Sequence, residues 1–203
     1  MELIYLTNFF TDNELLELKS YLKNFTEKKD STSSPQNEVM KDIPTERAYE
    51  APSIITEYMG RINTYFKLQD IPNIFDKIVS TVKKYHPDYE YFYSTYSRYS
   101  PIYGTPSLGP HFDSNLESII TFDMKIGGNT DWPISVENIY LPMEENSVII
   151  FKPAEVVHWR PRKKFYKNEY IDNIFIDFVN KEIKLNTSED ERRKISDEWS
   201  NYY

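Results

Sequence analysis

The stretch that decides how this chain folds is Pro110-His111-Phe112-Asp113, read together with Val156-Val157-His158-Trp159-Arg160. The first stretch holds a histidine and an aspartate separated by one residue. In an extended strand, residues i and i+2 project from the same face, so these two side chains would converge on one point. His158 follows a separate apolar run at residues 147–151, and the whole chain contains only three histidines.

Two imidazole nitrogens and one carboxylate oxygen form the 2-His-1-carboxylate facial triad. This donor set suits Fe(II) and leaves coordination positions open for substrates. An H-x-D pair by itself arises often by chance, and a later histidine adds little to it. The rest of the sequence therefore has to supply the context in which His111, Asp113 and His158 can be interpreted as metal ligands.

The composition predicts one soluble globular domain spanning residues 1–203. The chain is 39% hydrophobic and 28% charged, and it is long enough to bury a substantial core. No apolar run approaches the length of a membrane span, and residues 1–4 lack the layout of a secretory signal. We therefore expect a cytoplasmic location and no membrane partner. The absence of cysteine excludes disulfides, thiolate catalysis and cysteine-ligated metal sites.

The charge balance argues against nucleic acid as a partner. The net charge is −8, whereas a protein that neutralises many phosphates normally carries a basic face. Residues 160–167 are locally basic, but one such loop does not make a nucleic-acid footprint. The aromatic content is high, at 16%, which favours core and strand packing because tyrosine suits half-buried strands.

The N-terminal part, residues 1–88, is expected to be mainly helical. Thr11 and Glu14 have the spacing of a capping box at the start of a helix. Residues 26–50 are polar and lack an apolar period, which is typical of a surface loop or of a lid over a site. The expected elements are a short strand at 2–6 and helices at 12–25, 52–66 and 74–85.

The character of the chain changes at Tyr89, where strand-forming residues begin to dominate. Glycines and prolines between residues 101 and 110 predict a turn-rich loop that leads into His111. The expected strands lie at 91–99, 118–126, 132–136, 139–141, 147–151, 155–160 and 170–179. Helices followed by many short strands predict an α+β domain with a β-sandwich or jelly-roll core at 89–180 and a C-terminal tail at 181–203 that carries one more helix.

Residues 98–179 resemble the iron(II)/2-oxoglutarate-dependent oxygenases, and in layout the prolyl-hydroxylase-like branch of that superfamily. The resemblance rests on features that follow one another in the expected order. They are the strand at Arg98-Tyr99-Ser100-Pro101, a Gly/Pro loop, His111-x-Asp113, a strand at 119–124, an apolar strand at 147–151, His158 with a basic segment, and a last alternating strand. The opening residues 4–10 and the helix after them are also similar to the start of that branch.

The resemblance implies a double-stranded β-helix, in which two sheets form a funnel around the metal. His111, Asp113 and His158 would be the catalytic iron ligands, with 2-oxoglutarate and O2 as co-substrates. Members of the superfamily couple the oxidative decarboxylation of 2-oxoglutarate to the hydroxylation of a C–H bond. The substrate implied is a prolyl or other amino-acid side chain of a protein or peptide, or a small amino-acid-like molecule.

The sequence departs from the family at the cation that binds the distal carboxylate of 2-oxoglutarate. Prolyl-hydroxylase-like members place an arginine or lysine near the start of the last strand, and residues 170–173 contain none. Arg160 is the first candidate because it lies at i+2 from His158 and because a guanidinium binds a carboxylate bidentately. Lys167 and Lys125 are the other candidates. Tyr99 resembles the tyrosine that often hydrogen-bonds 2-oxoglutarate.

Three alternatives stay open at this point. A cupin-like metalloprotein could bind metal without oxygenase activity, although cupins generally use more histidines than this chain offers. A hydroxylase of free amino acids or other small metabolites would have the same triad. The third alternative is a β-sandwich in which the triad is accidental. The intact Asp113 argues against the halogenases of the superfamily, which replace this carboxylate with Gly or Ala.

Overall fold

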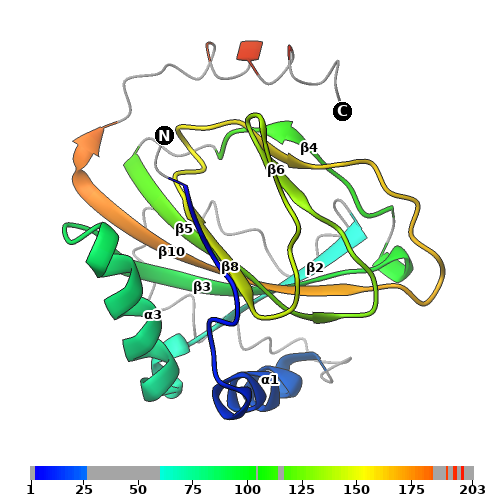
Figure 1. The fold of residues 1–203 in the computed structure, drawn as a ribbon, viewed down its shortest axis with the longest axis horizontal. Helices are drawn as coiled ribbons and strands as arrows, with labels where there is room; N and C mark the ends of the chain where they lie inside the picture. The colour runs from blue at the N-terminus through cyan, green and yellow to red at the C-terminus, as the bar shows by residue number, and fades with distance from the viewer. Residues whose placement is uncertain are drawn as a thin grey trace.

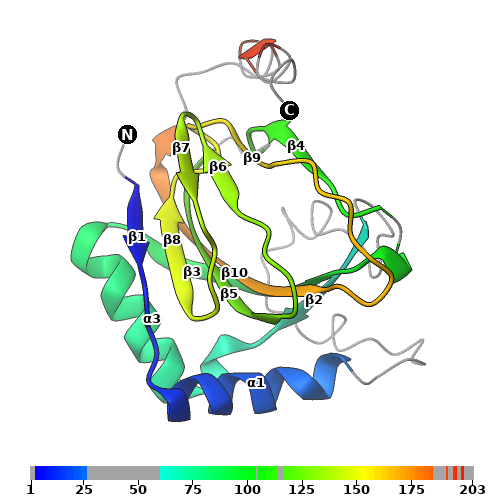
Figure 2. The same cartoon turned by 45° about the vertical axis from the view of Figure 1, so that its right-hand side comes forward.

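The computed structural model describes residues 3–26, 60–103, 105–113 and 117–184, together with positions 191, 194, 195 and 198. Two antiparallel sheets face each other, and two helices cover the outer side of the larger sheet (Figures 1 and 2). The helices are α1 (Asp12–Thr26) and α3 (Pro72–Tyr85), with short 3-10 turns η3 (Leu68–Asp70) and η4 (Pro101–Tyr103). In this described part, no helix is long and apolar enough to cross a membrane.

The larger sheet has six strands in the order β1-β8-β5-β10-β3-β2, and the smaller has four in the order β4-β9-β6-β7. From β3 onward the chain passes repeatedly from one sheet to the other, so the sheets are wound together as a double-stranded β-helix. The α+β class and this architecture confirm the prediction. The strands are β1 (Ile4–Leu6), β2 (Arg61–Phe66), β3 (Glu90–Tyr99), β4 (Leu108–His111), β5 (Glu117–Gly128), β6 (Ile134–Val136), β7 (Ile139–Leu141), β8 (Ser147–Phe151), β9 (His158–Arg160) and β10 (Ile171–Lys184).

The two-residue period of the strands separates the two faces of the larger sheet. On β5, Ile120, Phe122 and Met124 are fully buried in the cluster that the sheet forms with α1 and α3. Thr121 and Asp123 alternate with them and therefore face the smaller sheet. Polar side chains consequently line the inner face of the larger sheet at the cavity, while the largest apolar cluster lies under the helices. Two smaller apolar clusters fill other parts of the space between the sheets, one around Phe151 and one around Trp132.

The capping box expected at Thr11 is confirmed, and the helix expected at 74–85 is present but begins two residues earlier, at Pro72. The backbone N–H of Thr11 donates to Glu14 Oε2 at 2.7 Å, and the N–H of Glu14 donates to Thr11 Oγ1 at 3.3 Å, which is a capping box. Pro72 stands in the first turn of α3, where its missing N–H costs nothing. His86 caps the C-terminus of α3 through its N–H to Val82 O at 2.8 Å, as expected of a helix-end residue.

The prediction of a helix at 52–66 is wrong where the structure describes it. Residues 61–66 form β2, which pairs with β3 at the edge of the larger sheet. The apolar spacing of Ile62 and Phe66 suggested a helix. However, Arg61, Asn63 and Tyr65 alternate with those residues, and all three lie on the inner face of the sheet. Among the residues that the structure describes before β3, the α-helices are α1 and α3.

Three other boundaries differ from the prediction. Residues 108–111, which we expected in a loop, form β4 because they pair with β9. β9 is confined to residues 158–160, and β10 extends to Lys184, beyond the expected end of the core at 180. The predictions for residues 27–50 and most of those for 185–203 lie outside the described residues.

Asn146 joins the N-terminal segment to the turn before β8, and we expect this junction to stabilise the fold. Its amide accepts from Phe10 N at 2.8 Å and donates to Phe10 O at 2.7 Å, and its own φ is +66°. Asn146→Gly should lower the free energy of unfolding by about 1–3 kcal/mol through the loss of these buried bonds. Asn146→Ala should cost roughly 1–2 kcal/mol more, because a Cβ is unfavourable at this φ. Urea unfolding measures both, and an alanine variant as stable as the parent would contradict the prediction.

Candidate metal centre and its cavity

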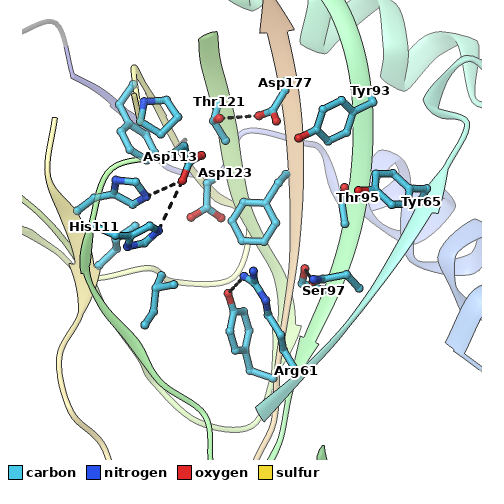
Figure 3. Close-up of a pocket in the computed structure, with 18 residues that line it drawn as sticks. Arg61, Tyr65, Tyr93, Thr95, Ser97, His111, Asp113, Thr121, Asp123 and Asp177 are labelled. Atoms are coloured by element: carbon cyan, nitrogen blue, oxygen red, sulfur yellow. Dashed lines mark hydrogen bonds and ion pairs between the residues drawn. The ribbon is translucent and has the colours of Figure 1, made fainter. Parts of the chain in front are cut away.

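His111 and His158 lie opposite each other on two neighbouring strands of the smaller sheet. β4 ends with His111, β9 begins with His158, and the two residues are partners in the ladder. Asp113 follows β4 by two residues. His111 Nε2 lies 3.5 Å and His158 Nε2 lies 3.6 Å from the same oxygen, Asp113 Oδ1 (Figure 3). All three potential ligand atoms lie within 4.8 Å of one another.

Backbone carbonyl groups orient both imidazole rings. His111 Nδ1 lies 2.8 Å from Gly109 O, and His158 Nδ1 lies 3.3 Å from Val156 O. An Nδ1–H that donates to a carbonyl oxygen leaves Nε2 as the unprotonated nitrogen, which is the usual arrangement of a metal-binding histidine. The N–H of Asp113 donates to Pro153 O at 3.0 Å, which fixes the backbone that carries the carboxylate.

The pKa values of two members of the triad suit metal binding at neutral pH. Burial, with the nearby charge of His111, lowers the pKa of His158 to about 3, so this ring is neutral. Burial alone would raise the pKa of Asp113. The hydrogen bond from His111 and the charges of His158, His111 and Arg61 outweigh it and lower that pKa to about 2. A neutral imidazole and an ionised carboxylate are the forms that bind metal.

The pKa of His111 is shifted in the opposite direction from those of His158 and Asp113. Burial disfavours its protonated form, but the hydrogen bond to Asp113, the charge of Asp113 and the carbonyl of Gly109 together raise its pKa above the ordinary value. The three donors are of the right type, close to one another and held by the backbone, so they fit a divalent ion. His111, Asp113 and His158 are the residues that would hold it.

A cavity of about 190 Å³ opens between the triad and the inner face of the larger sheet. This volume is below the range of roughly 300–1,000 Å³ usual for ligand sites, so the cavity suits small molecules. Its floor consists of cross-strand rows from β2, β3, β5 and β10. Among the floor residues that line the cavity are Arg61 and Tyr99 in one row, Asn63 and Ser97 in the next, Tyr65, Thr95, Phe175 and Asp123 in the third, and Tyr93, Asp177 and Thr121 in the last.

Tyr99 lies on the cavity wall, as expected of a residue that meets a ligand. Its hydroxyl accepts a hydrogen bond from Arg61 Nη1 at 2.6 Å. Arg61 is the only lysine or arginine among the described residues that line the cavity. Its positive charge contributes to lowering the pKa values of both His111 and Asp113, so it acts electrostatically on the triad.

The sequence interpretation missed Arg61 because it assigned this segment to a helix. The signal that could have found it is the alternation of Arg61, Asn63 and Tyr65, three polar or amphipathic residues at a spacing of two. Such a pattern is typical of a strand whose inner face is polar.

Arg160 faces inward, as its spacing from His158 predicted, but it does not line the cavity. Its side chain is 1% exposed, donates to Trp132 O at 2.5 Å and forms an ion pair with Asp123 at 3.3 Å. Asn173 also donates to Asp123, at 2.8 Å. Burial raises the pKa of Asp123, although the charge of Arg160 opposes this. The guanidinium therefore already binds a carboxylate of the protein.

The two lysine candidates also lie away from the cavity wall. Lys125 is buried and donates to Thr130 O at 3.1 Å and to Asp131 Oδ1 at 3.4 Å, so its charge is directed at a neighbouring loop. Lys167 is exposed in a turn before β10. The binding of 2-oxoglutarate by Arg160, Lys167 or Lys125 therefore stays a prediction, and the cavity wall favours Arg61.

Comparison with known proteins shows the fold. No family model matches the chain, and no curated protein matches it. Among solved structures, it is similar to the non-heme alpha ketoglutarate dependent epimerase SnoN from nogalamycin biosynthesis (8% identity, TM-score 0.60, covering 88% of this chain and 78% of that one). It is also similar to a Pseudomonas putida prolyl-4-hydroxylase (9% identity, TM-score 0.54, 88% and 92%). A third match is HygX from Streptomyces hygroscopicus with nickel and 2-oxoglutarate bound (10% identity, TM-score 0.54, 94% and 89%). The resemblance to this superfamily is thus confirmed at the level of the fold.

The raised pKa of His111 predicts how metal affinity depends on pH. A divalent ion must displace the proton of this ring, so affinity should fall as the pH drops through the raised pKa and should level off above it. His158 and Asp113 titrate far below this window and do not contribute to the change. Anaerobic Co(II) titrations between about pH 8 and pH 6 would measure the affinity. A constant affinity over this window would show that His111 is not a ligand.

Proposed function

We propose that this protein is an iron(II)- and 2-oxoglutarate-dependent dioxygenase that hydroxylates a C–H bond of an amino-acid side chain or a small amino-acid-like molecule. The observation that carries the proposal is the convergence of His111, Asp113 and His158 on one point facing a cavity that is lined by polar and aromatic side chains. The 2-His-1-carboxylate set leaves coordination positions open for 2-oxoglutarate and O2. Solved structures with this fold include a prolyl-4-hydroxylase and a protein with 2-oxoglutarate bound, which supports the reaction class.

When bound, the iron and 2-oxoglutarate would supply the oxidising chemistry, and the protein would supply binding, orientation and exclusion of water. The ring of Phe151 lies edge-on to His158, with 5.1 Å between ring centroids, and it closes one side of the cavity with an apolar surface. Eight of the eleven floor residues named above are buried, and Arg61, Tyr93 and Phe175 are half-buried. A ligand between the triad and the floor would therefore be held out of bulk water, where hydrogen bonds and charges act more strongly.

Arg61 and Tyr99 are the residues proposed to receive the distal carboxylate of 2-oxoglutarate. The guanidinium offers several donors in one plane, which matches the geometry of a carboxylate, and the Tyr99 hydroxyl holds it in place at 2.6 Å. Both residues line the cavity at the row of the floor farthest from Asp177. This assignment replaces Arg160, whose guanidinium is committed to Asp123.

The triad should be essential for turnover but not for folding. Asp113→Ala and His158→Ala should each abolish 2-oxoglutarate-dependent succinate formation, because two remaining ligands do not hold the metal in a productive geometry. The measurement is succinate release with Fe(II), 2-oxoglutarate and O2, with circular dichroism to verify folding. His86→Gln serves as the matched control, since His86 caps α3 outside the cavity and its replacement should leave turnover intact.

The wild-type protein distinguishes the alternatives. An oxygenase should give a charge-transfer band when Fe(II) and 2-oxoglutarate are added anaerobically, followed by slow succinate formation in air. A cupin-like metalloprotein would bind the metal without that band. A β-sandwich with an accidental triad would do neither. Succinate formation that persists in both Asp113→Ala and His158→Ala would refute the assignment of the metal ligands.

Replacing Arg61 should weaken the binding of 2-oxoglutarate selectively. Arg61→Ala should raise the concentration for half-maximal succinate formation by about tenfold or more, since a charge-assisted bidentate contact is lost. Tyr99→Phe should have a smaller effect in the same direction, because the ring stays in place. The measurement is the dependence of succinate formation on 2-oxoglutarate concentration, with the exposed Lys167→Ala as control.

Arg160→Ala should give a different result. It leaves Asp123 buried without its cation, so its main effect should be a loss of stability of about 3–5 kcal/mol. An unchanged 2-oxoglutarate requirement in Arg61→Ala, together with a raised one in Lys167→Ala, would transfer the role from Arg61 to Lys167.

A further inference from the structure

At the end of the floor opposite Arg61, a carboxylate lies between hydroxyl groups. Asp177 on β10 is the ladder partner of Tyr93 on β3 and of Thr121 on β5. Thr121 Oγ1 donates to Asp177 Oδ1 at 2.5 Å, and the hydroxyl end of Tyr93 points toward the same carboxylate (Figure 3). All three side chains line the cavity, and Figure 3 shows Asp177 and Thr121 on the far side of the site from Arg61.

The aromatic rings of Tyr65 and Tyr93 complete the end of the cavity that holds Asp177, and these three residues are called the corner below. Tyr65 and Tyr93 pack edge to face with their centroids 5.7 Å apart, and both line the cavity. Burial, with the negative charge of Asp177, raises the pKa of both tyrosines, so their hydroxyls stay protonated and neutral. A carboxylate beside electron-rich aromatic rings is the arrangement that binds ammonium groups, through an ion pair and cation–π contacts.

The corner is close to the triad, and its carboxylate lies at the other end of the floor from Arg61, although the charge of Arg61 still reaches Tyr65. The charge of Asp113 reaches Tyr93 and contributes to its raised pKa. On β8, Phe151 is the ladder partner of Thr121 and also packs against His158. Tyr93 and Tyr99 are six residues apart on β3, which is about 20 Å along the strand. The floor therefore carries a cation at one end and a carboxylate at the other.

We propose that Asp177, with Tyr65 and Tyr93, forms the substrate subsite of the cavity and that the substrate is a small molecule carrying a protonated amine. This inference rests on the proposed function for the reaction, and it names the class of substrate. The opposite charges of Arg61 and Asp177, at the two ends of the cavity, determine where the co-substrate and the substrate bind. The anionic co-substrate is drawn to Arg61, and the ammonium group is drawn to Asp177.

The cavity volume agrees with such a substrate. Because 2-oxoglutarate would share the volume of about 190 Å³, the remaining space suits a small free amine better than a folded protein loop. A prolyl residue inside a peptide has no charged nitrogen, whereas free proline and other cyclic amines do. Recognition by Asp177 thus favours the free amine over the peptide-bound residue.

The test compares two ring compounds of nearly the same shape. Pyrrolidine is protonated at neutral pH, whereas tetrahydrofuran is neutral. Saturation-transfer NMR titrations on the purified protein, without turnover, should show that pyrrolidine binds and tetrahydrofuran does not compete with it. Asp177→Asn should weaken pyrrolidine binding by about tenfold or more, as expected for the loss of one desolvated charge contact.

Asp131→Asn is the matched control, because it makes the same change in net charge at a side chain that is 98% exposed. Its pyrrolidine affinity should equal that of the wild type. If Asp177→Asn does not fold, Thr121→Val takes its place. That variant removes a hydrogen bond that holds the carboxylate, and it should weaken binding by a smaller factor. Equal binding of the two rings to the wild type would overturn the proposal, as would full pyrrolidine affinity in the folded Asp177→Asn or Thr121→Val variant.

The binding assay separates this proposal from the proposed function. Succinate formation without a preference for pyrrolidine would leave the oxygenase assignment standing and refute the amine subsite. The opposite outcome is a wild-type protein that prefers pyrrolidine over tetrahydrofuran, loses this preference in Asp177→Asn, and forms no succinate. That outcome would establish the subsite and refute the oxygenase assignment.

Discussion

The alternation of side chains along extended strands is the constraint on which this structure depends. Every second residue of β3, β5 and β10 packs under the helices, and the residues between them face the smaller sheet. The helices need an apolar surface to bury, so the outer positions of β5 and β10 are mainly Ile, Phe and Met, and several inner positions are polar. The apolar cluster under the helices is thus separate from the cavity that holds the candidate site, whereas the two smaller clusters contribute part of the cavity wall. Polar residues in the cavity cost little stability where they bond to one another, as Thr121 does to Asp177.

The role of a charged side chain inside this protein depends on the residue that it pairs with as well as on its place in the fold. Asp123 and Arg160 are both about 1% exposed and neutralise each other, which keeps Arg160 turned toward Trp132 and away from the ligand space. Arg61 has a different environment, because a tyrosine hydroxyl is its partner on the cavity wall. Two arginines inside one barrel therefore have different roles. They differ both in the side chain that each guanidinium meets and in burial, because Arg160 is fully buried and Arg61 is half-buried.

Much of the fold and the triad could be predicted from the sequence, because both depend on local patterns. The capping box at Thr11, the alternation in β10 and the H-x-D pair are visible within a few residues, and the structure contains each of them. Arg61 could not be found in that way. Its segment has apolar residues at a spacing of four, and only pairing with β3 makes it a strand. The ion pair of Arg160 could not be predicted either, because its partner Asp123 lies on the other sheet. Strand spacing predicts the face to which a side chain points but not the residue that it contacts there.

The place of β10 in the larger sheet has a consequence for how the molecule is made. This strand is the last one along the described chain, yet it lies between β5 and β3 and pairs with both. Until it leaves the ribosome, two strand edges that will be interior in the native protein have no neighbour. The larger sheet can therefore be completed only after residues 171–184 have been translated, and its assembly is dominated by contacts between distant segments, which are slow to form. A nascent chain that stalls before residue 171 would expose both edges, and chaperones would be needed to shield them from other chains.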